Sequence, residues 1–216
     1  MCVFTLQQII EYYTNRSSPV YICFLDASKA FDRINHWKLF EKLIKRDVNK
    51  QIIRLIVQWY CTQTFCVRWG GHISDCFNVC NGVRQGGILS AYLFNIYMND
   101  LSLELNNSNN GCILNGITMN HLMYADDTCL LAPSPAALQH LLDICSEFAR
   151  VNDIVFNEGK TKLMCYRSRL QENLPIPDIV LNGTHISEVD EYKYLGIMLQ
   201  CTKSNESDMK RQIKIR

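Results

Sequence analysis

Apolar residues follow the spacing of a helix in one part of the chain and of a strand in the next. Residues 5–13 place four apolar side chains on one helical face: Leu6, Ile9, Ile10 and Tyr13. Residues 20–26 are apolar at odd and even positions alike, which predicts a central strand that is buried on both sides and ends at Asp26. The first helix starts almost at residue 1, so its apolar face is expected to remain uncovered.

Four polar side chains are placed to cap further helices: Asn35, Asn49, Ser90 and Ser134. The helical patterns that follow them cover residues 37–44, 52–60, 91–105 and 135–153. Pro135 stands at the first position of the last helix, where its missing N–H costs no hydrogen bond. This last segment is the clearest helix in the chain.

Short strands account for most of the remaining sequence. Residues 64–80 predict a hairpin that turns at "GG", and two further strands flank "YADD". Other strand patterns occupy residues 153–156, 161–166, 178–181 and 192–199, and residues 171–178 predict a loop. With no internal repeat and no interdomain linker, the pattern favours an α+β fold in which a sheet is layered with helices.

The charge balance removes the simplest signature of a nucleic-acid binder. The 216 residues carry 22 basic and 21 acidic side chains, for a net charge of +1. Binding to nucleic acid would have to use local basic patches, either Lys42, Lys45 and Arg46 or the segment 209–216. For each segment alone, a solvated helix face is the simpler interpretation.

The cysteines and the N-terminus indicate a cellular environment. The eleven cysteines are odd in number, contain no CxxC pair and often lie in apolar runs, which favours reduced, buried thiols of an intracellular protein over disulfides or zinc ligands. No apolar run reaches the roughly 18 residues that span a bilayer. The N-terminus also lacks the basic region of a signal peptide. We expect neither secretion nor insertion into a membrane.

Two adjacent aspartates, Asp126 and Asp127, interrupt an apolar strand-turn-strand pattern. One aspartate in a turn is common, but two neighbouring carboxylates repel each other. A divalent cation would relieve this repulsion, and Asp26 at the end of another apolar strand is the obvious third ligand. Carboxylates without matching His or Cys residues favour Mg²⁺ and thus phosphoryl or nucleotidyl transfer by two metal ions.

Two other segments could serve such a reaction. The run "NGVRQGGILS" contains glycines that let the backbone approach a ligand, although a glycine-rich turn before a helix is common and the P-loop spacing is absent. The run "FNEGKTK" offers Lys160 and Lys162, which could give a proton or a charge to a leaving pyrophosphate. Without the carboxylates, these lysines would be ordinary surface residues.

Five segments in this order resemble the palm motifs of reverse transcriptases: "FLDASKAFDRINH", "GVRQGGILSAYLFNIYMNDL", "YADD", "NEGKTK" and "YKYLGIML". They most resemble the motifs of non-LTR (LINE-type) retrotransposons. The resemblance implies an RNA-directed DNA polymerase whose palm is an antiparallel sheet with helices packed on one face. Its implied partners are an RNA template, a DNA primer and deoxynucleoside triphosphates, and action in the nucleus would follow from the family alone.

The resemblance also implies roles for individual residues. The implied catalytic residues are Asp26, Asp126 and Asp127, as ligands of two Mg²⁺ ions, and Lys160, as a general acid toward pyrophosphate. The implied nucleotide contacts are Ala27, Phe31, Arg84, Gln85 and Gly86, with Phe31 as the steric gate against a ribose 2′-hydroxyl. The implied primer grip consists of Tyr194, Leu195 and Gly196.

The match also predicts a domain division. A reverse transcriptase domain is expected over residues 1–202, with partial fingers at 1–19 and the palm at 20–200, before a basic stub at 203–216. Incomplete fingers and no thumb are expected, as in a fragment of a retrotransposon polyprotein. Ala91 also stands where such families usually have proline.

Two alternatives to an active reverse transcriptase stay open. One is a catalytically inactive remnant that acts at most as a binding module. The other is a different palm-type transferase, such as a nucleotide cyclase. Residues Phe31, Gln85 and Lys160 together favour the reverse transcriptase over the cyclase.

Overall fold

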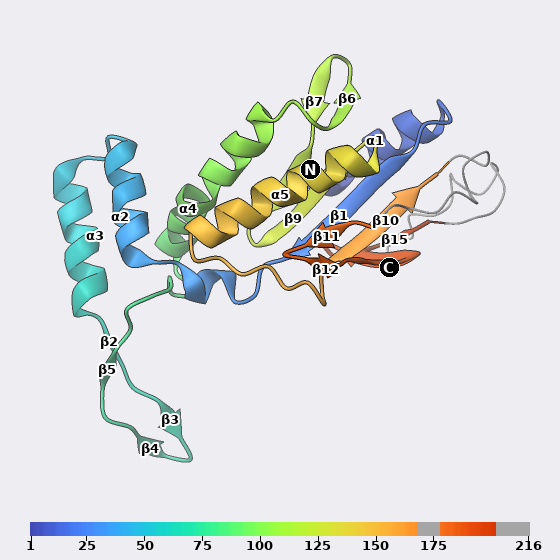
Figure 1. Cartoon of the computed structure of the whole chain (residues 1–216). Helices are drawn as coiled ribbons and strands as arrows, with labels where there is room; N and C mark the ends of the chain where they lie inside the picture. The colour runs from blue at the N-terminus through green and yellow to red at the C-terminus, as the bar shows by residue number, and fades with distance from the viewer. Residues whose placement is uncertain (168–177, 202–216) are drawn as a thin grey trace.

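A five-stranded sheet forms the centre of the computed structural model, which describes residues 1–167 and 178–201. The strand order is β13 (Ser187–Glu188), β10 (Lys162–Tyr166), β1 (Val20–Asp26), β9 (Asp127–Ala132) and β8 (His121–Tyr124). Neighbouring strands are antiparallel except β10 and β13. Figure 1 shows β10, β1 and β9 side by side. The strands predicted at 20–26, at 161–166 and around "YADD" are confirmed. Most of the predicted loop 171–178, the stub 203–216 and the basic segment 209–216 lie outside the described residues.

The helices are α1 (Cys2–Thr14), α2 (His36–Lys45), α3 (Lys50–Thr62), α4 (Ile88–Asn107) and α5 (Pro135–Val151), with a 3₁₀ turn η1 (Ala30–Arg33). Three predicted caps are confirmed, since Asn35, Asn49 and Ser134 accept hydrogen bonds from backbone N–H groups of the first helical turn. The predicted cap at Ser90 is wrong. Helix α4 begins at Ile88, after the extended backbone of Gly87, and Ser90 is buried within its first turn.

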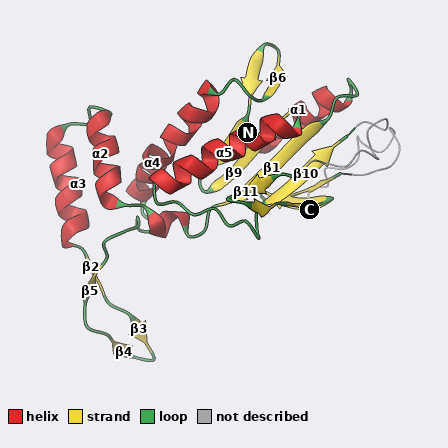
Figure 2. Ribbon diagram, in the orientation of Figure 1, coloured by secondary structure: helices red, strands yellow, loops and turns green. Residues whose placement is uncertain are grey.

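Outside the central sheet, the described residues also form short two-stranded pairs (Figure 2). They pair β2 (Thr64–Phe65) with β5 (Phe77–Asn78), β3 (Arg68–Trp69) with β4 (His72–Ile73), β6 (Cys112–Leu114) with β7 (Ile117–Met119), β11 (Val180–Leu181) with β12 (Thr184–His185), and β14 (Glu191–Tyr194) with β15 (Ile197–Gln200). The two hairpins from β2 to β5 form one arm (residues 64–78) that projects from the end of α3.

Residues 153–156 are not a strand, although the sequence predicted one. Asp153 takes a left-handed backbone conformation with φ of 57° after the end of α5. Phe156 then makes an isolated bridge with Ala27, and the N–H of Ser28 donates to Val155 O at 2.9 Å. The branched and aromatic side chains suited a strand, but the main chain here joins the loop after β1 instead.

Both faces of the sheet are covered. On one face, Cys23 and Leu25 of β1 pack in the core that is shared with α2, α3, α4 and α5. On the other face, Ile22 and Phe24 pack with α1 and the β14–β15 hairpin. The expectation that the apolar face of α1 stays uncovered is therefore wrong, because Leu6 and Ile9 are fully buried against the sheet. The prediction that helices pack on one face alone is likewise incomplete, because α1 packs on the face opposite to α2, α3, α4 and α5.

The candidate basic patch on α2, Lys42, Lys45 and Arg46, is largely neutralised by acids. The Lys42 side chain is buried, and its Nζ lies 2.5 Å from Asp100 Oδ2. Arg46 donates to the other oxygen of Asp100 at 2.9 Å, while Lys45 pairs with Glu41. Burial alone would raise the pKa of Asp100, but Lys42 and Arg46 lower it below its ordinary value.

The described part of the chain contains no helix that is long and apolar enough to cross a membrane.

Replacement of Asp100 by alanine should destabilise the fold, because it leaves the buried ammonium of Lys42 without its carboxylate. We expect the free energy of unfolding to fall by about 2 kcal/mol, less than for a fully buried pair because Asp100 is partly exposed. Urea denaturation measures this change. Glu41→Ala is the control, since its pair with Lys45 is exposed and its loss should leave stability nearly unchanged. Equal effects of the two substitutions would contradict the assignment.

Candidate active site

The sheet brings two of the predicted carboxylates to facing positions. In the antiparallel register of β1 and β9, Asp26 lies directly opposite Asp127. Facing residues of an antiparallel pair point to the same side of the sheet. By strand alternation, this is the side of Phe24 and the β14–β15 hairpin. Two residues far apart in the sequence thus present their charges together.

The third carboxylate, Asp126, lies in the tight turn between β8 and β9. Tyr124 pairs with Asp127, so Ala125 and Asp126 are the two turn residues. Ala125 has a φ of 52°, a left-handed conformation that is costly for a residue with a Cβ. This turn holds Asp126 beside Asp127 at the exposed end of the hairpin.

The pKa of Asp127 reflects the proximity of the three carboxylates. The pKa of Asp127 is raised above its ordinary value, first by desolvation and then by the negative charges of Asp126 and Asp26. A positive charge lies close by, because Lys160 Nζ is 3.8 Å from Asp26 Oδ2. Lys160 remains 69% exposed and Asp26 35% exposed, so both groups are accessible to a ligand.

The loop that carries Lys160 is fastened to the backbone of Asp26. The N–H of Asn157 donates to Asp26 O at 2.8 Å, and the N–H of Asp26 donates to Thr161 Oγ1 at 3.5 Å. Asn157 Oδ1 in turn accepts from the N–H of Lys160 at 3.1 Å. These hydrogen bonds explain why the "NEGKT" run places a lysine at the end of β1.

The "NGVRQGG" loop is held beside Phe31 by main-chain hydrogen bonds. Gly82 N donates to Ile34 O at 2.7 Å, and Val83 N donates to Phe31 O at 2.8 Å. The Phe31 ring is fixed by stacking on Phe94, with 4.4 Å between ring centroids. The predicted nucleotide contacts Arg84, Gln85 and Gly86 are exposed, and Ala27 is buried.

Of the predicted primer grip, the turn is the accessible part. Leu195 and Gly196 both have positive φ and form the two-residue turn of the β14–β15 hairpin. The side chain of Tyr194 is only 2% exposed and packs against Phe24. Tyr194 therefore supports the hairpin rather than presenting its ring to a ligand.

Tyr192 is a neighbour of the carboxylates that the sequence did not single out. Its ring stacks on Phe24 with 4.2 Å between centroids. Burial raises the pKa of Tyr192, and the charges of Asp127 and Asp26 raise it further. The available signal was strand alternation, since Tyr192 lies two residues before Tyr194 and thus on the same face of β14.

The donor atoms fit a hard divalent cation. Within residues 1–167 and 178–201, no three His, Cys, Asp or Glu side chains are gathered as ligands of one ion. Mg²⁺, however, is usually held by one or two carboxylates and completed by water and substrate phosphates. The facing pair Asp26 and Asp127, with Asp126 beside it, supplies that kind of oxygen donor. A bound cation would offset both the desolvation and the carboxylate repulsion that raise the pKa of Asp127.

Asp127→Asn should stabilise the metal-free protein at neutral pH. The raised pKa means that ionisation of Asp127 destabilises the folded state as pH rises above the ordinary value of about 4. The gain should stay below about 1 kcal/mol because the side chain is exposed and screened. It should vanish near pH 3, where both states are protonated.

Urea denaturation in the presence of a chelator, at pH 7 and pH 3, tests this expectation. Asp32→Asn provides a control on η1, where the aspartate is also exposed. An Asp127→Asn protein no more stable than wild type at pH 7 would show that desolvation and the neighbouring charges do not destabilise ionised Asp127.

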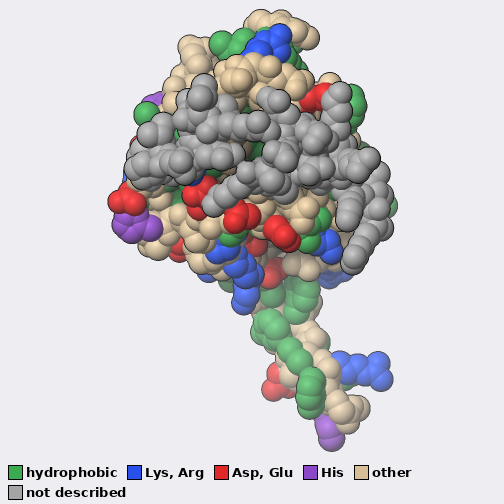
Figure 3. All heavy atoms as spheres, turned by 90° about the vertical axis from the view of Figure 1, so that its right-hand side faces the viewer, with side chains coloured by type: hydrophobic (Ala, Val, Ile, Leu, Met, Phe, Trp, Pro, Cys, Tyr) green, Lys and Arg blue, Asp and Glu red, His purple; other side chains and the backbone are tan. Residues whose placement is uncertain are grey.

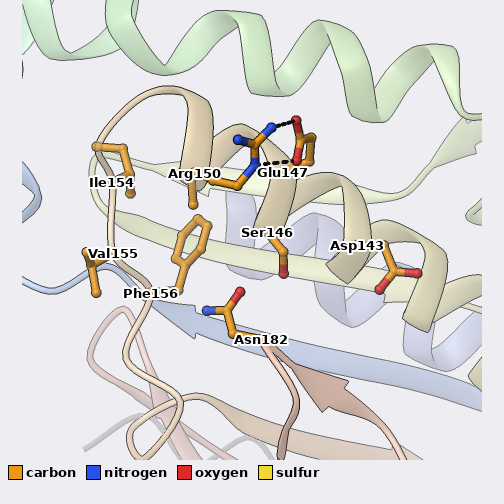
Figure 4. A pocket seen from close by; sticks show the side chains of 9 residues that line it. Asp143, Ser146, Glu147, Arg150, Ile154, Val155, Phe156 and Asn182 are labelled. Carbon is orange, nitrogen blue, oxygen red and sulfur yellow. Dashed lines mark hydrogen bonds and ion pairs between the residues drawn. The ribbon is translucent and has the colours of Figure 1, made fainter.

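The pocket in Figure 4 lies elsewhere and contains none of the predicted site residues. It has a volume of about 400 Å³ and lies between α5, residues 154–156 and Asn182. Glu147 and Arg150 form an ion pair at 2.6 Å in its lining. The carboxylates instead lie at the open end of the sheet.

Comparison with known families and relatives gives one consistent result. A family model described as "Reverse transcriptase (RNA-dependent DNA polymerase)" matches residues 3–199. The "RNA-directed DNA polymerase from mobile element jockey" of Drosophila funebris is 31% identical over 82% of this chain and 19% of its own length. The "Retrovirus-related Pol polyprotein from type-2 retrotransposable element R2DM" of Drosophila melanogaster is 29% identical over 84% of this chain and 18% of its own length. The chain thus spans about a fifth of these relatives.

Solved structures with a similar fold include a telomerase from Candida tropicalis in complex with a fragment of telomeric RNA. It aligns with a TM-score of 0.63 and 14% identity, over 92% of this chain and 31% of its own. The apo form of a Candida tropicalis telomerase aligns with a TM-score of 0.62 and 16% identity, over 92% and 34% of the two chains. At this identity the likeness concerns the fold.

Proposed function

Because the chain belongs to the reverse transcriptase (RNA-dependent DNA polymerase) family, we propose that it is the catalytic core of an RNA-directed DNA polymerase. The observation that carries this proposal is the pairing of Asp26 with Asp127 next to Asp126 and Lys160. The relatives from the jockey and R2 mobile elements support the resemblance to non-LTR retrotransposons. The reaction is the transfer of a deoxynucleotide to a primer 3′-hydroxyl on an RNA template.

The carboxylates would hold the catalytic cations. Asp26 and Asp127 offer facing oxygens, and Asp126 adds a third carboxylate from the turn. When bound, two Mg²⁺ ions would align the primer 3′-hydroxyl with the α-phosphate and neutralise the charge on the attacking and leaving oxygens. Lys160, already paired with Asp26, is placed to give a proton or a positive charge to the departing pyrophosphate.

The other motif segments would position the substrates. The exposed run Arg84–Gly86 offers side chains and an open backbone beside Phe31 for the incoming nucleotide. Stacking on Phe94 would keep the Phe31 ring in place as a wall against the 2′-hydroxyl of a ribonucleotide. The Leu195-Gly196 turn is on the carboxylate side of the sheet, where it could support the primer end.

The domain division follows the same proposal. Residues 20–200 would be the palm and residues 1–19 part of the fingers, with a basic segment at 203–216. The partners would be an RNA template, a DNA primer and deoxynucleoside triphosphates. A catalytically inactive remnant that only binds nucleic acid is the alternative that an assay must distinguish.

Primer extension on an RNA template with Mg²⁺ tests the proposal. We expect incorporation of the deoxynucleotides that the template specifies, much less incorporation of ribonucleotides, and none without template. Soluble and folded protein that extends no primer yet retains the RNA–DNA duplex in a binding assay would favour the remnant. Incorporation that ignores the template would contradict a polymerase role.

A further inference from the structure

The arm of residues 64–78 carries two cysteines on opposite strands. Its base is the pairing of Phe65 with Phe77, and the next residues inward on the two strands are Cys66 and Cys76. Both cysteines are free and exposed. Figure 3 shows the arm extending away from the rest of the protein, where solvent reaches it.

The ladder of strand pairs in the arm is interrupted at Cys66 and Cys76. Pairing resumes at Arg68 with Ile73, and Ser74 N donates to Val67 O at 2.9 Å. Two residues on one strand, 66 and 67, thus stand against three on the other, 74 to 76, which is a β-bulge. A bulge weakens the local pairing, so a covalent link at this point would add an otherwise missing constraint.

The geometry of facing strand residues suits a disulfide. Opposite residues of antiparallel strands have Cα atoms roughly 4.5–5.5 Å apart, within the roughly 4.4–6.8 Å range of disulfides. Counted inward from the Phe65–Phe77 pair, Cys66 and Cys76 hold equivalent positions on the two strands. A side-chain hydrogen bond with Cys76, which raises the pKa of Cys66, agrees with this placement.

We propose that Cys66 and Cys76 are a redox-active dithiol, which a low-molecular-weight disulfide such as oxidised glutathione converts reversibly into a cross-strand disulfide. This modification site is independent of the polymerase function proposed above. The arm also contacts the site region, since the Arg84 guanidinium lies 5.3 Å from the centre of the Phe65 ring. Oxidation would stiffen the arm one residue away from this contact.

The exchange proceeds in two balanced steps. The thiolate of one cysteine attacks a sulfur of the small disulfide, forms a mixed disulfide and releases one small thiolate. The thiolate of the second cysteine then attacks the protein sulfur of the mixed disulfide and releases the second small thiolate. Two electrons pass from the cysteine pair to the small disulfide, and the two thiol protons end on the released thiols.

Equilibration of the full chain in buffers of reduced and oxidised glutathione tests the proposal. After acid quenching and alkylation, peptide mass spectrometry identifies each disulfide. We expect a Cys66–Cys76 link whose equilibrium constant of formation is at least about tenfold larger in the folded chain than in urea, because the arm holds the thiols together. Cys61 and Cys80, which are also exposed, should give only mixed disulfides with glutathione.

Matched variants separate the pair from general thiol reactivity. Cys66→Ser should leave Cys76 as a glutathione mixed disulfide, whereas Cys61→Ser should leave the Cys66–Cys76 link unchanged. Protection of the buried thiols Cys23 and Cys145 from alkylation shows that each variant is folded. The proposal is overturned if the link forms no more readily in the folded chain than in urea. It is equally overturned if Cys66 and Cys76 carry glutathione to the same extent as Cys61 and Cys80.

Discussion

Replacing Asp26 by asparagine is expected to lower RNA-templated incorporation by at least about a thousandfold, which corresponds to about 4 kcal/mol of lost transition-state stabilisation. The substitution preserves the size of the side chain but removes the charge that faces Asp127 and pairs with Lys160. An amide is a poor ligand for Mg²⁺ compared with a carboxylate. The loss should therefore appear in kcat rather than only in the KM for nucleotide.

The matched control is Asp32→Asn. Asp32 follows Asp26 closely in the sequence but lies exposed on η1, outside the facing carboxylate pair. This variant should retain incorporation within about twofold, as expected for surface substitutions away from such a site. If Asp26→Asn retained most of the activity, the facing pair could not be the catalytic centre.

Gly82→Ala should be the most damaging single-methyl addition around the site. Gly82 has a φ of +90°, and a Cβ there would lie 2.9 Å from the backbone Cα and O of Asp32. Neither the left-handed backbone nor the main-chain contact can relax without moving the loop. We expect a loss of about 2–4 kcal/mol in unfolding free energy, as the sum of overpacking and backbone strain.

Urea denaturation measures the cost, and Gly71→Ala is its control. Gly71 has a similar φ of +85°, but an added Cβ there meets nothing within 4 Å. The control should therefore lose only about 1 kcal/mol, from backbone strain alone. Equal losses at the two positions would mean that the contact of Gly82 with Asp32 contributes nothing. A raised KM for nucleotide in Gly82→Ala is also expected, because this loop continues into Arg84 and Gln85.

The sequence was sufficient for elements whose structure is decided locally. Side-chain caps at Asn35, Asn49 and Ser134 depend on the next three residues, and these were predicted correctly. Residues 20–26 were recognised because a strand buried on both sides needs apolar residues at every position.

What the sequence missed depends on contacts between distant segments. The apolar face of α1 is covered by strands and hairpins that come later in the chain, and periodicity could not reveal that partner. Residues 153–156 have strand propensity, but their main chain bonds to the loop after Asp26. At the site, the motifs marked the carboxylates, while the position of Tyr192 depends on the packing of β14 over Phe24.

Binding of a divalent cation is the measurement that tests the central claim most directly, because it does not require the chain to be an active polymerase. Titration with Mn²⁺, followed by electron paramagnetic resonance, should show a site in wild-type protein and in Asp32→Asn. In the double variant Asp26→Asn with Asp127→Asn, the affinity should fall by at least about tenfold, since even outer-shell changes cost metal sites about 10–100-fold. Unchanged Mn²⁺ affinity in this folded double variant would contradict the claim that the facing aspartates form the metal-binding catalytic centre.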